Sequence, residues 1–316
     1  TGRTGAIMKL VFVANLLLDN VLIANNPRVA AVMKGLEETC DKDTVLIVLG
    51  NVGLTKASIR AARTVLANLP CSHKLYVAGR YDLQALDSRT KSYESILQQE
   101  LTEYGFHLLD HAPYIIENHV FVGNIAWYDG TLWTVPSDTW PIVPAWPRIR
   151  TDAAKGWNAW FATHLKSSQD ELTSNQFFHR CQSRLRTHLD SMVPILSVPE
   201  NKLVVCTNSM PAHSLFTTKY TPKEHYNRYA AGWIPQAGWV KILSDLKAQT
   251  SWFAGFNQDY AIGKISLRGH NNNNYQYRNN TPDPNGLKVE NVGSSKPLVV
   301  IIDPTAEVKA SQPYVM

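Results

Sequence analysis

Cysteine is scarce in this sequence, and its spacing argues against a disulfide framework. The 316 residues contain four cysteines, and no two of them form a C-x-x-C pair: Cys40, Cys71, Cys181 and Cys206. This usage fits a reduced, cytoplasmic setting better than an oxidising one. Cys206 lies in an apolar run, so we expect it to be a small buried hydrophobic residue.

Charge and long apolar runs are scarce as well. Asp, Glu, Lys and Arg make up 18% of the residues, the formal net charge is +5, and no dense Lys/Arg stripe is present. A nucleic-acid or nucleotide partner is therefore permitted but weakly supported. No apolar stretch is long enough to span a membrane and no secretory signal pattern is visible, so we expect no membrane partner.

Tryptophan, by contrast, is abundant. Six of the nine tryptophans lie between residues 127 and 160, and two more are Trp233 and Trp239. Residues 130–150 and 212–235 show no periodicity, which predicts two irregular insertions rich in Trp. Their tryptophans either pack the insertions onto the fold or present a surface to a protein partner.

Strand and helix patterns alternate along the rest of the chain. Apolar runs predict strands at 8–13, 45–49, 74–77, 120–125, 203–206 and 252–254. Helical spacing is found at 27–39, 58–69, 92–104, 152–165, 170–192 and 236–248. Further antiparallel strands are expected near 262–268 and 298–302. This alternation is typical of an α/β protein with mainly parallel strands and right-handed crossovers.

The domain boundaries are expected close to the ends of the sequence. Residues 1–7 precede Met8 and are expected to be a vector-derived remnant. Residues 8–303 are expected to form a single domain that includes both insertions. Residues 304–316 are expected to be a loose C-terminal tail.

Five predicted strands end in short motifs at the edge of the sheet where α/β proteins bind ligands. In chain order the motifs are Ala14-Asn15-Leu16-Leu17, Gly50-Asn51, Gly79-Arg80-Tyr81-Asp82, Thr207-Asn208-Ser209-Met210-Pro211 and Gly255-Phe256-Asn257-Gln258. Their order and spacing resemble the calcineurin-like metallophosphoesterases, whose motifs are D-x-H, G-D, G-N-H-[DE], T-H-x-x-P and G-H-x-H. The resemblance implies a four-layer αββα sandwich that in active members carries two metal ions.

The residues that carry the family's chemistry are replaced in this sequence. The resemblance places eight residues at former metal-ligand or catalytic positions: Asn15, Leu17, Asn51, Arg80, Tyr81, Asn208, Phe256 and Gln258. Two dications about 3.5–4 Å apart need carboxylates and imidazoles to hold them. Amides are weak neutral ligands, leucine and phenylalanine offer none, and Arg80 adds a fixed positive charge. We therefore expect no metal, no other cofactor and no catalytic residue.

The general acid is replaced too, because Tyr81 stands where the family has histidine. A phenol with an ordinary pKa of about 10 donates a proton poorly at neutral pH. His213 and His270 are candidate substitutes, and each also fits a solvated loop histidine. Taken together, the motifs favour a catalytically inactive pseudoenzyme that binds or scaffolds a protein partner through the former active-site face. The alternative is a residual or re-purposed phosphoesterase.

A second alternative is a metal-free binder of phosphate or nucleotides. Its candidate ligand-binding residues are Arg80, Asp82, Ser209 and Asn257, with Arg80 as the anchor. The competing interpretation is a collapsed site, in which Arg80 pairs with Asp82 or another acid and the amides satisfy one another.

Overall fold

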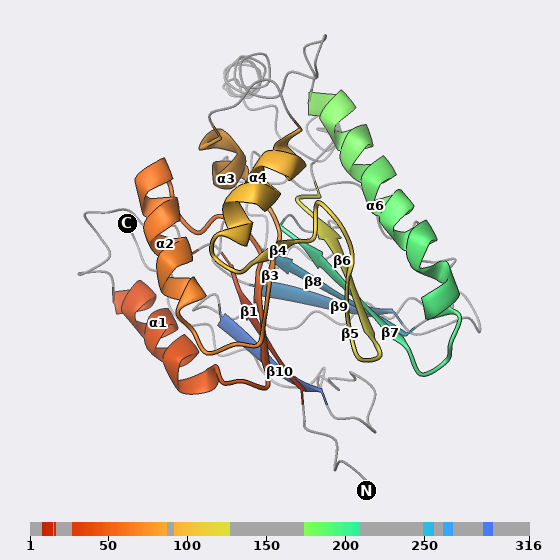
Figure 1. Cartoon of the computed structure of the whole chain (residues 1–316), viewed down its shortest axis with the longest axis horizontal. Helices are drawn as coiled ribbons and strands as arrows, with labels where there is room; N and C mark the ends of the chain where they lie inside the picture. Colours follow the sequence, from red (N-terminus) through yellow and green to blue (C-terminus); the bar gives the residue numbers. More distant parts are fainter. Residues whose placement is uncertain are drawn as a thin grey trace, which may run out of the picture.

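Two five-stranded sheets form the centre of the computed structural model (Figure 1). The structure describes residues 8–14, 16, 27–86, 92–126, 174–208, 249–255, 262–267 and 287–292. Within these ranges the fold is mixed α/β, as the sequence predicts. None of the helices described in these ranges is long and apolar enough to cross a membrane.

The first sheet is parallel except at one edge. Its order is β10 (Leu287–Val292), β1 (Met8–Val13), β2 (Thr44–Val48), β3 (His73–Tyr76) and β4 (His107–Leu108). Strands β1 to β4 are parallel, and β10 pairs with β1 in the antiparallel direction. The parallel strands therefore end at one edge, where the loops after β2 and β3 lie next to each other.

The second sheet has parallel strands in its centre and antiparallel strands at both edges. Its order is β5 (Tyr114–Ile116), β6 (His119–Asn124), β7 (Lys202–Thr207), β8 (Gln249–Gly255) and β9 (Ile262–Leu267). Strands β6, β7 and β8 are parallel to one another. The antiparallel pairing of β8 with β9 confirms the expected strand near residues 262–268.

The helices connect these strands and lie along the sheets (Figure 1). They are α1 (Pro27–Thr39), α2 (Lys56–Ala67), α3 (Arg80–Gln84), α4 (Tyr93–Thr102) and α6 (Ser174–Leu196). Helices α1 and α2 follow β1 and β2 as crossovers, whereas α6 precedes β7 and lies on the opposite side of the structure, beside the second sheet.

Each of the parallel strands β1 and β2 is buried on both faces, which explains why its sequence is a continuous apolar run. Every second residue of these strands, such as Leu10 and Ile47, belongs to one hydrophobic cluster with Phe121 and Cys206 of the second sheet. The alternate residues, such as Leu46, belong to a second cluster that includes side chains of α1, α2, α4 and α6. Cys206 is a buried hydrophobic residue, as expected.

Some element boundaries and three short elements differ from the expectation. Helix α2 begins at Lys56 because Thr55 caps it: the Thr55 side chain accepts a bond from the Ser58 N–H, and the Ser58 hydroxyl accepts one from the Thr55 N–H. Helix α3 and strands β4 and β5 were not predicted, because each has five residues or fewer and shows no readable periodicity. The six-residue strand β10 was not predicted either.

Several expectations lie outside the described residues. These are the helices at 152–165 and 236–248, the strand near 298–302, the insertions at 130–150 and 212–235, and the two terminal segments. The strand that pairs with β1 at the edge of the first sheet is β10.

Candidate functional site

The loops after β2, β3 and β7 meet at the carboxyl ends of the strands. Gly50 has a left-handed φ of 78°, and a Cβ there would lie 2.5 Å from the Gly79 nitrogen and 2.9 Å from Asn208 Nδ2. A Cβ on Gly79 would overlap the backbone nitrogen of Asn51. Both glycines are therefore required by close backbone approach. The structure thus brings three of the sequence-predicted motifs together.

Asn51 lies at the centre of this junction and is fully buried. Its φ of 57° is in the left-handed region, which asparagine tolerates better than most residues. Its Oδ1 accepts a hydrogen bond from the Tyr81 N–H at 3.2 Å, and its own N–H donates to Asp82 Oδ2 at 3.0 Å. The side-chain oxygen therefore holds the next loop in place.

Asn208, like Asn51, makes a structural hydrogen bond, and this bond joins the two sheets. Its Nδ2 donates a hydrogen bond to the Leu49 carbonyl at 2.6 Å, and the residue is buried. Because Asn208 follows β7 and Leu49 follows β2, this bond links the second sheet to the first. The two amides thus each bond to the backbone of a neighbouring loop.

Asp82 is turned inward and has no exposed side-chain surface. Its carboxylate accepts bonds from the N–H groups of Asn51 and Gly79, at 3.0 and 2.8 Å. It also accepts a bond from the Tyr76 hydroxyl at 2.7 Å. These donors satisfy a buried negative charge. Asp82 therefore presents no exposed oxygen to a ligand, which differs from its predicted binding role.

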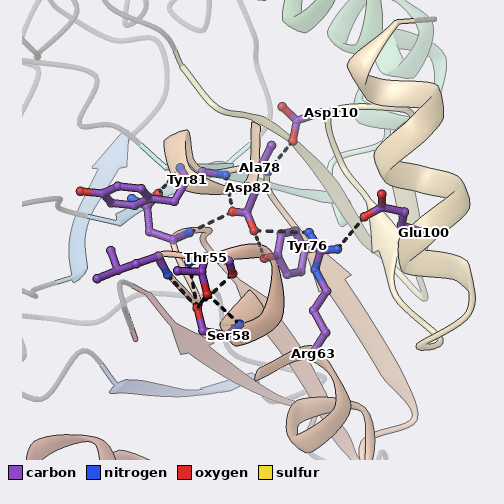
Figure 2. Close-up of polar contacts among 12 residues, drawn as sticks. Thr55, Ser58, Arg63, Tyr76, Ala78, Tyr81, Asp82, Glu100 and Asp110 are labelled. Atoms are coloured by element: carbon purple, nitrogen blue, oxygen red, sulfur yellow. Dashed lines mark hydrogen bonds and ion pairs between the residues drawn. The ribbon is translucent and has the colours of Figure 1, made fainter. Parts of the chain in front are cut away.

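The ion-pair partner of Asp82 is Arg63. Arg63 lies on α2 and reaches Asp82 Oδ1 at 3.4 Å and Glu100 Oε2 at 3.0 Å (Figure 2). Burial by itself lowers the pKa of Arg63, but Tyr76 and Asp82 raise it above its ordinary value. Burial, followed by the charge of Asp82, raises the pKa of Tyr76, so its hydroxyl stays protonated and donates. Among the described residues, the arginine that pairs with Asp82 is therefore Arg63, which reaches the carboxylate from within the core.

Arg80 and Tyr81 are the half-buried side chains at the start of α3. The Arg80 guanidinium carbon lies 5.2 Å from the centre of the Tyr81 ring, which is a cation–π arrangement. Arg80 and Tyr81 directly follow Gly79, whose backbone is tightly packed against Gly50. The backbone of the two residues is therefore held in place, and their side chains are only half-buried.

Asp110 is a second buried carboxylate that the sequence analysis missed. It accepts bonds from the Ala78 N–H at 2.8 Å, the Ile125 N–H at 2.9 Å and the Tyr93 hydroxyl at 3.0 Å. Burial raises its pKa to about 7, although these three bonds favour the charged form. The residue ties the end of β3 to the end of β6. An aspartate directly after the short apolar pair Leu108-Leu109 is the signal that could have marked it.

The end of β6 carries a further strained position beside this site. Ala126 has a φ of 49°, although alanine seldom adopts the left-handed region. Its N–H donates to Asn124 Oδ1 at 2.7 Å, and Asn124 Nδ2 donates to the Cys181 carbonyl of α6 at 2.8 Å. The surrounding bonds hold this conformation in place.

The remaining candidate residues lie outside the described residues: Asn15, Leu17, Ser209, Phe256, Asn257, Gln258, His213 and His270. Of the eight former ligand or catalytic positions, the structure therefore describes Asn51, Arg80, Tyr81 and Asn208. Within the described ranges, no three His, Cys, Asp or Glu side chains are grouped so that they could hold a metal ion.

Comparison with known proteins finds similarity only among solved structures, and this similarity is low. No protein-family model matches this chain, and no curated protein matches it. Among solved structures, it is similar to the phosphopantetheinyl hydrolase PptH from Mycobacterium tuberculosis, with a TM-score of 0.46, 15% identity, and coverage of 72% of this chain and 75% of that one. It is also similar to a protein of unknown function from Aquifex aeolicus, with a TM-score of 0.31, 10% identity, and coverage of 74% and 92% respectively. At these TM-scores the likeness carries no argument about function.

Proposed function

We propose that this chain is a metallophosphoesterase-like pseudoenzyme that binds or scaffolds a protein partner through the face where its strands end. The fold we infer is the four-layer αββα sandwich of that family, with the two Trp-rich insertions placed over this face. Two mixed sheets that share a hydrophobic cluster, with α1 and α2 along the first and α6 beside the second, support this architecture.

The observation that carries the proposal is the use made of Asn51 and Asn208. Both stand at positions that the family resemblance assigns to metal ligands. Asn51 Oδ1 bonds to the Tyr81 N–H, and Asn208 Nδ2 bonds to the Leu49 carbonyl. A metal ligand must direct a lone pair toward the ion, but the amide nitrogen of Asn208 is a hydrogen-bond donor only, and it donates to the Leu49 carbonyl. These bonds support the proposal that residues at former metal-ligand positions now stabilise the fold.

The chemistry of Arg80 agrees with this interpretation. A guanidinium keeps its charge in proteins and repels a dication placed beside it. Its stacking with Tyr81 forms a planar cationic and aromatic pair near the surface. Arginine and tyrosine are enriched among the residues that dominate protein interfaces. Within the residues that the structure describes, the Arg80–Tyr81 pair is therefore the part of this face to which we assign partner binding.

A restoration experiment tests the inferred ancestry. The family residues would be returned at all eight positions in one chain, as Asn15→Asp, Leu17→His, Asn51→Asp, Arg80→Asn, Tyr81→His, Asn208→His, Phe256→His and Gln258→His. We expect the restored chain to retain about two manganese ions after dialysis, the number a dimetal centre holds, and the wild type to retain none. Circular dichroism would check that both chains are folded. A folded restored chain without manganese would contradict the inferred family.

A second experiment tests the loss of activity. The wild-type chain would be incubated with bis-(p-nitrophenyl) phosphate and manganese, and nitrophenolate release followed by absorbance. We expect no release above the protein-free rate. Metal-dependent turnover would instead support a residual phosphoesterase and overturn the pseudoenzyme proposal.

The binding role is tested with affinity capture from the native host. Proteins retained by the wild type would be compared with those retained by Arg80→Glu, Tyr81→Ala and the control Lys34→Glu, on the exposed side of α1. We expect one specific partner to be lost with the first two variants and kept with the control. A partner set that is unchanged in all variants would contradict binding through this face.

The metal-free anion binder predicts a different result. Calorimetry of the wild type with nucleotides and inorganic phosphate would then give binding heat that disappears in Arg80→Ala. Under the scaffold proposal, neither ligand gives such heat.

A further inference from the structure

Two cysteines that are distant in sequence lie side by side at the opposite end of the first sheet. Cys40 directly follows α1, and Cys71 lies two residues before β3. The parallel register pairs Val45 with His73, so the segments that lead into β2 and β3 run next to each other. The Ser72 hydroxyl also donates to the Thr44 carbonyl at 3.5 Å. These loops lie at the amino ends of the strands, away from the candidate site.

The two thiols are in direct contact just below the surface. The side chains of Cys40 and Cys71 interact with each other. Each residue is 7% exposed, whereas the adjacent residues Asp41, Pro70 and Ser72 are exposed. Both cysteines are free in the structure.

Two lysines place positive charge beside this pair. Lys74 Nζ donates to the Cys71 carbonyl at 3.3 Å, and Lys9 Nζ donates to the Thr39 carbonyl and to Asp41 Oδ2, both at 2.8 Å. The hydrogen bond from Cys40 lowers the pKa of Cys71, and the two lysines add to this effect against burial and the charge of Asp41. The same hydrogen bond, together with burial, raises the pKa of Cys40.

Cys206 shows the opposite behaviour and serves as a reference. It is fully buried in the cluster between the sheets, and burial raises its pKa above the ordinary value. A thiolate, and not a thiol, is the reactive form. The environment of Cys71 thus favours reaction, whereas that of Cys206 suppresses it.

We propose that Cys40 and Cys71 form an oxidation-sensitive pair that a hydroperoxide converts into a disulfide. The Cys71 thiolate attacks one peroxide oxygen, the O–O bond breaks, and the leaving hydroxide takes the Cys40 proton to form water. The Cys40 thiolate then attacks the Cys71 sulfur of the sulfenic acid, the S–O bond breaks, and the second hydroxide is protonated to water. Two sulfurs lose two electrons in total, and the peroxide gains them.

Peptide mapping of the folded full-length chain tests the proposal. The protein would be treated with hydrogen peroxide near stoichiometric amounts, its remaining thiols blocked with N-ethylmaleimide, and the digest analysed by mass spectrometry without reduction. We expect one cross-linked product, Cys40–Cys71, lighter by the mass of two hydrogens and removed by dithiothreitol. The matched variant Cys181→Ala should give the same product, because its thiol lies on α6. Absence of this link, or oxidation confined to Cys181 and Cys206, would overturn the proposal.

Single substitutions separate the two roles in the pair. In Cys40→Ser the sulfenic acid at Cys71 has no partner, so a 1,3-diketone probe should label Cys71 strongly. In Cys71→Ser the same probe should label Cys40 weakly. Without peroxide, alkylation of Cys71 in the wild type should be at least about tenfold faster than that of Cys206, since the pKa of Cys71 is lowered and that of Cys206 is raised. Equal rates would contradict the proposed activation, and the wild-type measurements decide the matter even where a variant does not fold.

Discussion

Single side chains set the geometry where the loops after β2 and β3 meet. The Asp82 carboxylate binds the backbone of both loops and is charge-balanced by Arg63 from α2. Asn51 adds a left-handed turn and a bond to Tyr81. These are interior polar groups, so removing one leaves partners buried without compensation.

Asp82→Ala is expected to destabilise the protein strongly. Its loss removes the buried carboxylate partner of Arg63 and the acceptor of two backbone N–H groups and of the Tyr76 hydroxyl, and breaking a buried ion pair costs about 3–5 kcal/mol. Urea unfolding followed by fluorescence would measure the free energy of unfolding. The control is Glu100→Ala, whose partly exposed side chain contacts the same arginine and should matter by about 1 kcal/mol or less. Similar losses in the two variants would contradict this assignment.

Asn51 can be tested for its backbone conformation and its side-chain bond separately. Asn51→Ala removes the bond to Tyr81 and places alanine at a φ of 57°. We expect a loss of about 2–3 kcal/mol, the sum of a hydrogen bond and the left-handed penalty. Asn51→Gly removes the bond alone and should cost about 1 kcal/mol less. If glycine were no better than alanine in chemical denaturation, the left-handed conformation would carry no penalty.

Among the elements, helix α6 is fixed to α4 by a buried carboxylate. Glu94 of α4 is 1% exposed on its side chain, and it pairs with Arg180 at 2.9 Å and with Arg184 at 3.3 Å. The two arginines are one turn apart on α6, so they approach Glu94 from the same face. Tyr93, next to Glu94, packs against Phe177. This cluster decides where α6 lies along the second sheet.

The two arginines are expected to be partly redundant. Arg180→Ala leaves Arg184 to balance Glu94, and the reverse holds for Arg184→Ala, so each single variant should lose about 1 kcal/mol. The double variant leaves the carboxylate buried and unpaired and should lose about 3–5 kcal/mol, more than the sum of the singles. Thermal and urea unfolding of the four chains completes this cycle. Strict additivity would show that Glu94 does not couple them.

Most elements of ordinary length could be predicted from the sequence, whereas the very short ones and strand β10 could not. The apolar run of β1 and the helical spacing of α1 give their observed bounds, because burial on a fixed face leaves a periodic trace. Strand β4 has two residues and is formed only because β3 lies beside it. For the site, strand-end positions predicted that Asn51, Arg80 and Asn208 belong to one edge. The partners of Asp82 and Asp110 depend on tertiary packing and leave no pattern in the sequence.

At the scale of the whole molecule, the interior contains titratable groups whose effects on the free energy of unfolding change with pH in opposite directions. Burial lowers the pKa of His119 and of His188 to about 4, with nearby Lys202 and Arg184 adding to the respective effects. In the described part of the chain, neither ring nitrogen of His119 has a hydrogen-bond partner. Asp110, whose pKa is raised to about 7, opposes them, because its ionisation costs stability as the pH rises between about 4 and 7.

Acidification is therefore expected to weaken the fold through these histidines. A histidine with a lowered folded-state pKa contributes fully above its unfolded value of about 6.5, and this contribution is lost as the pH falls through about 4. His119→Gln should remove up to about 3 kcal/mol of the stability change between pH 7 and 4, as should His188→Gln. Unfolding free energies measured across this range in wild type and variants isolate the histidines, since Asp110 is common to all. Parallel curves would contradict the prediction.

The place of β10 has a consequence during synthesis on the ribosome. Strand β1 begins at residue 8, yet its outer neighbour is formed by residues 287–292. Until that late segment emerges, β1 keeps one row of backbone groups unpaired, and such an edge invites pairing with other chains. The nascent polypeptide thus exposes an unpaired strand edge until residues 287–292 have been made, and its yield in a cell should depend on chaperones that cover this edge.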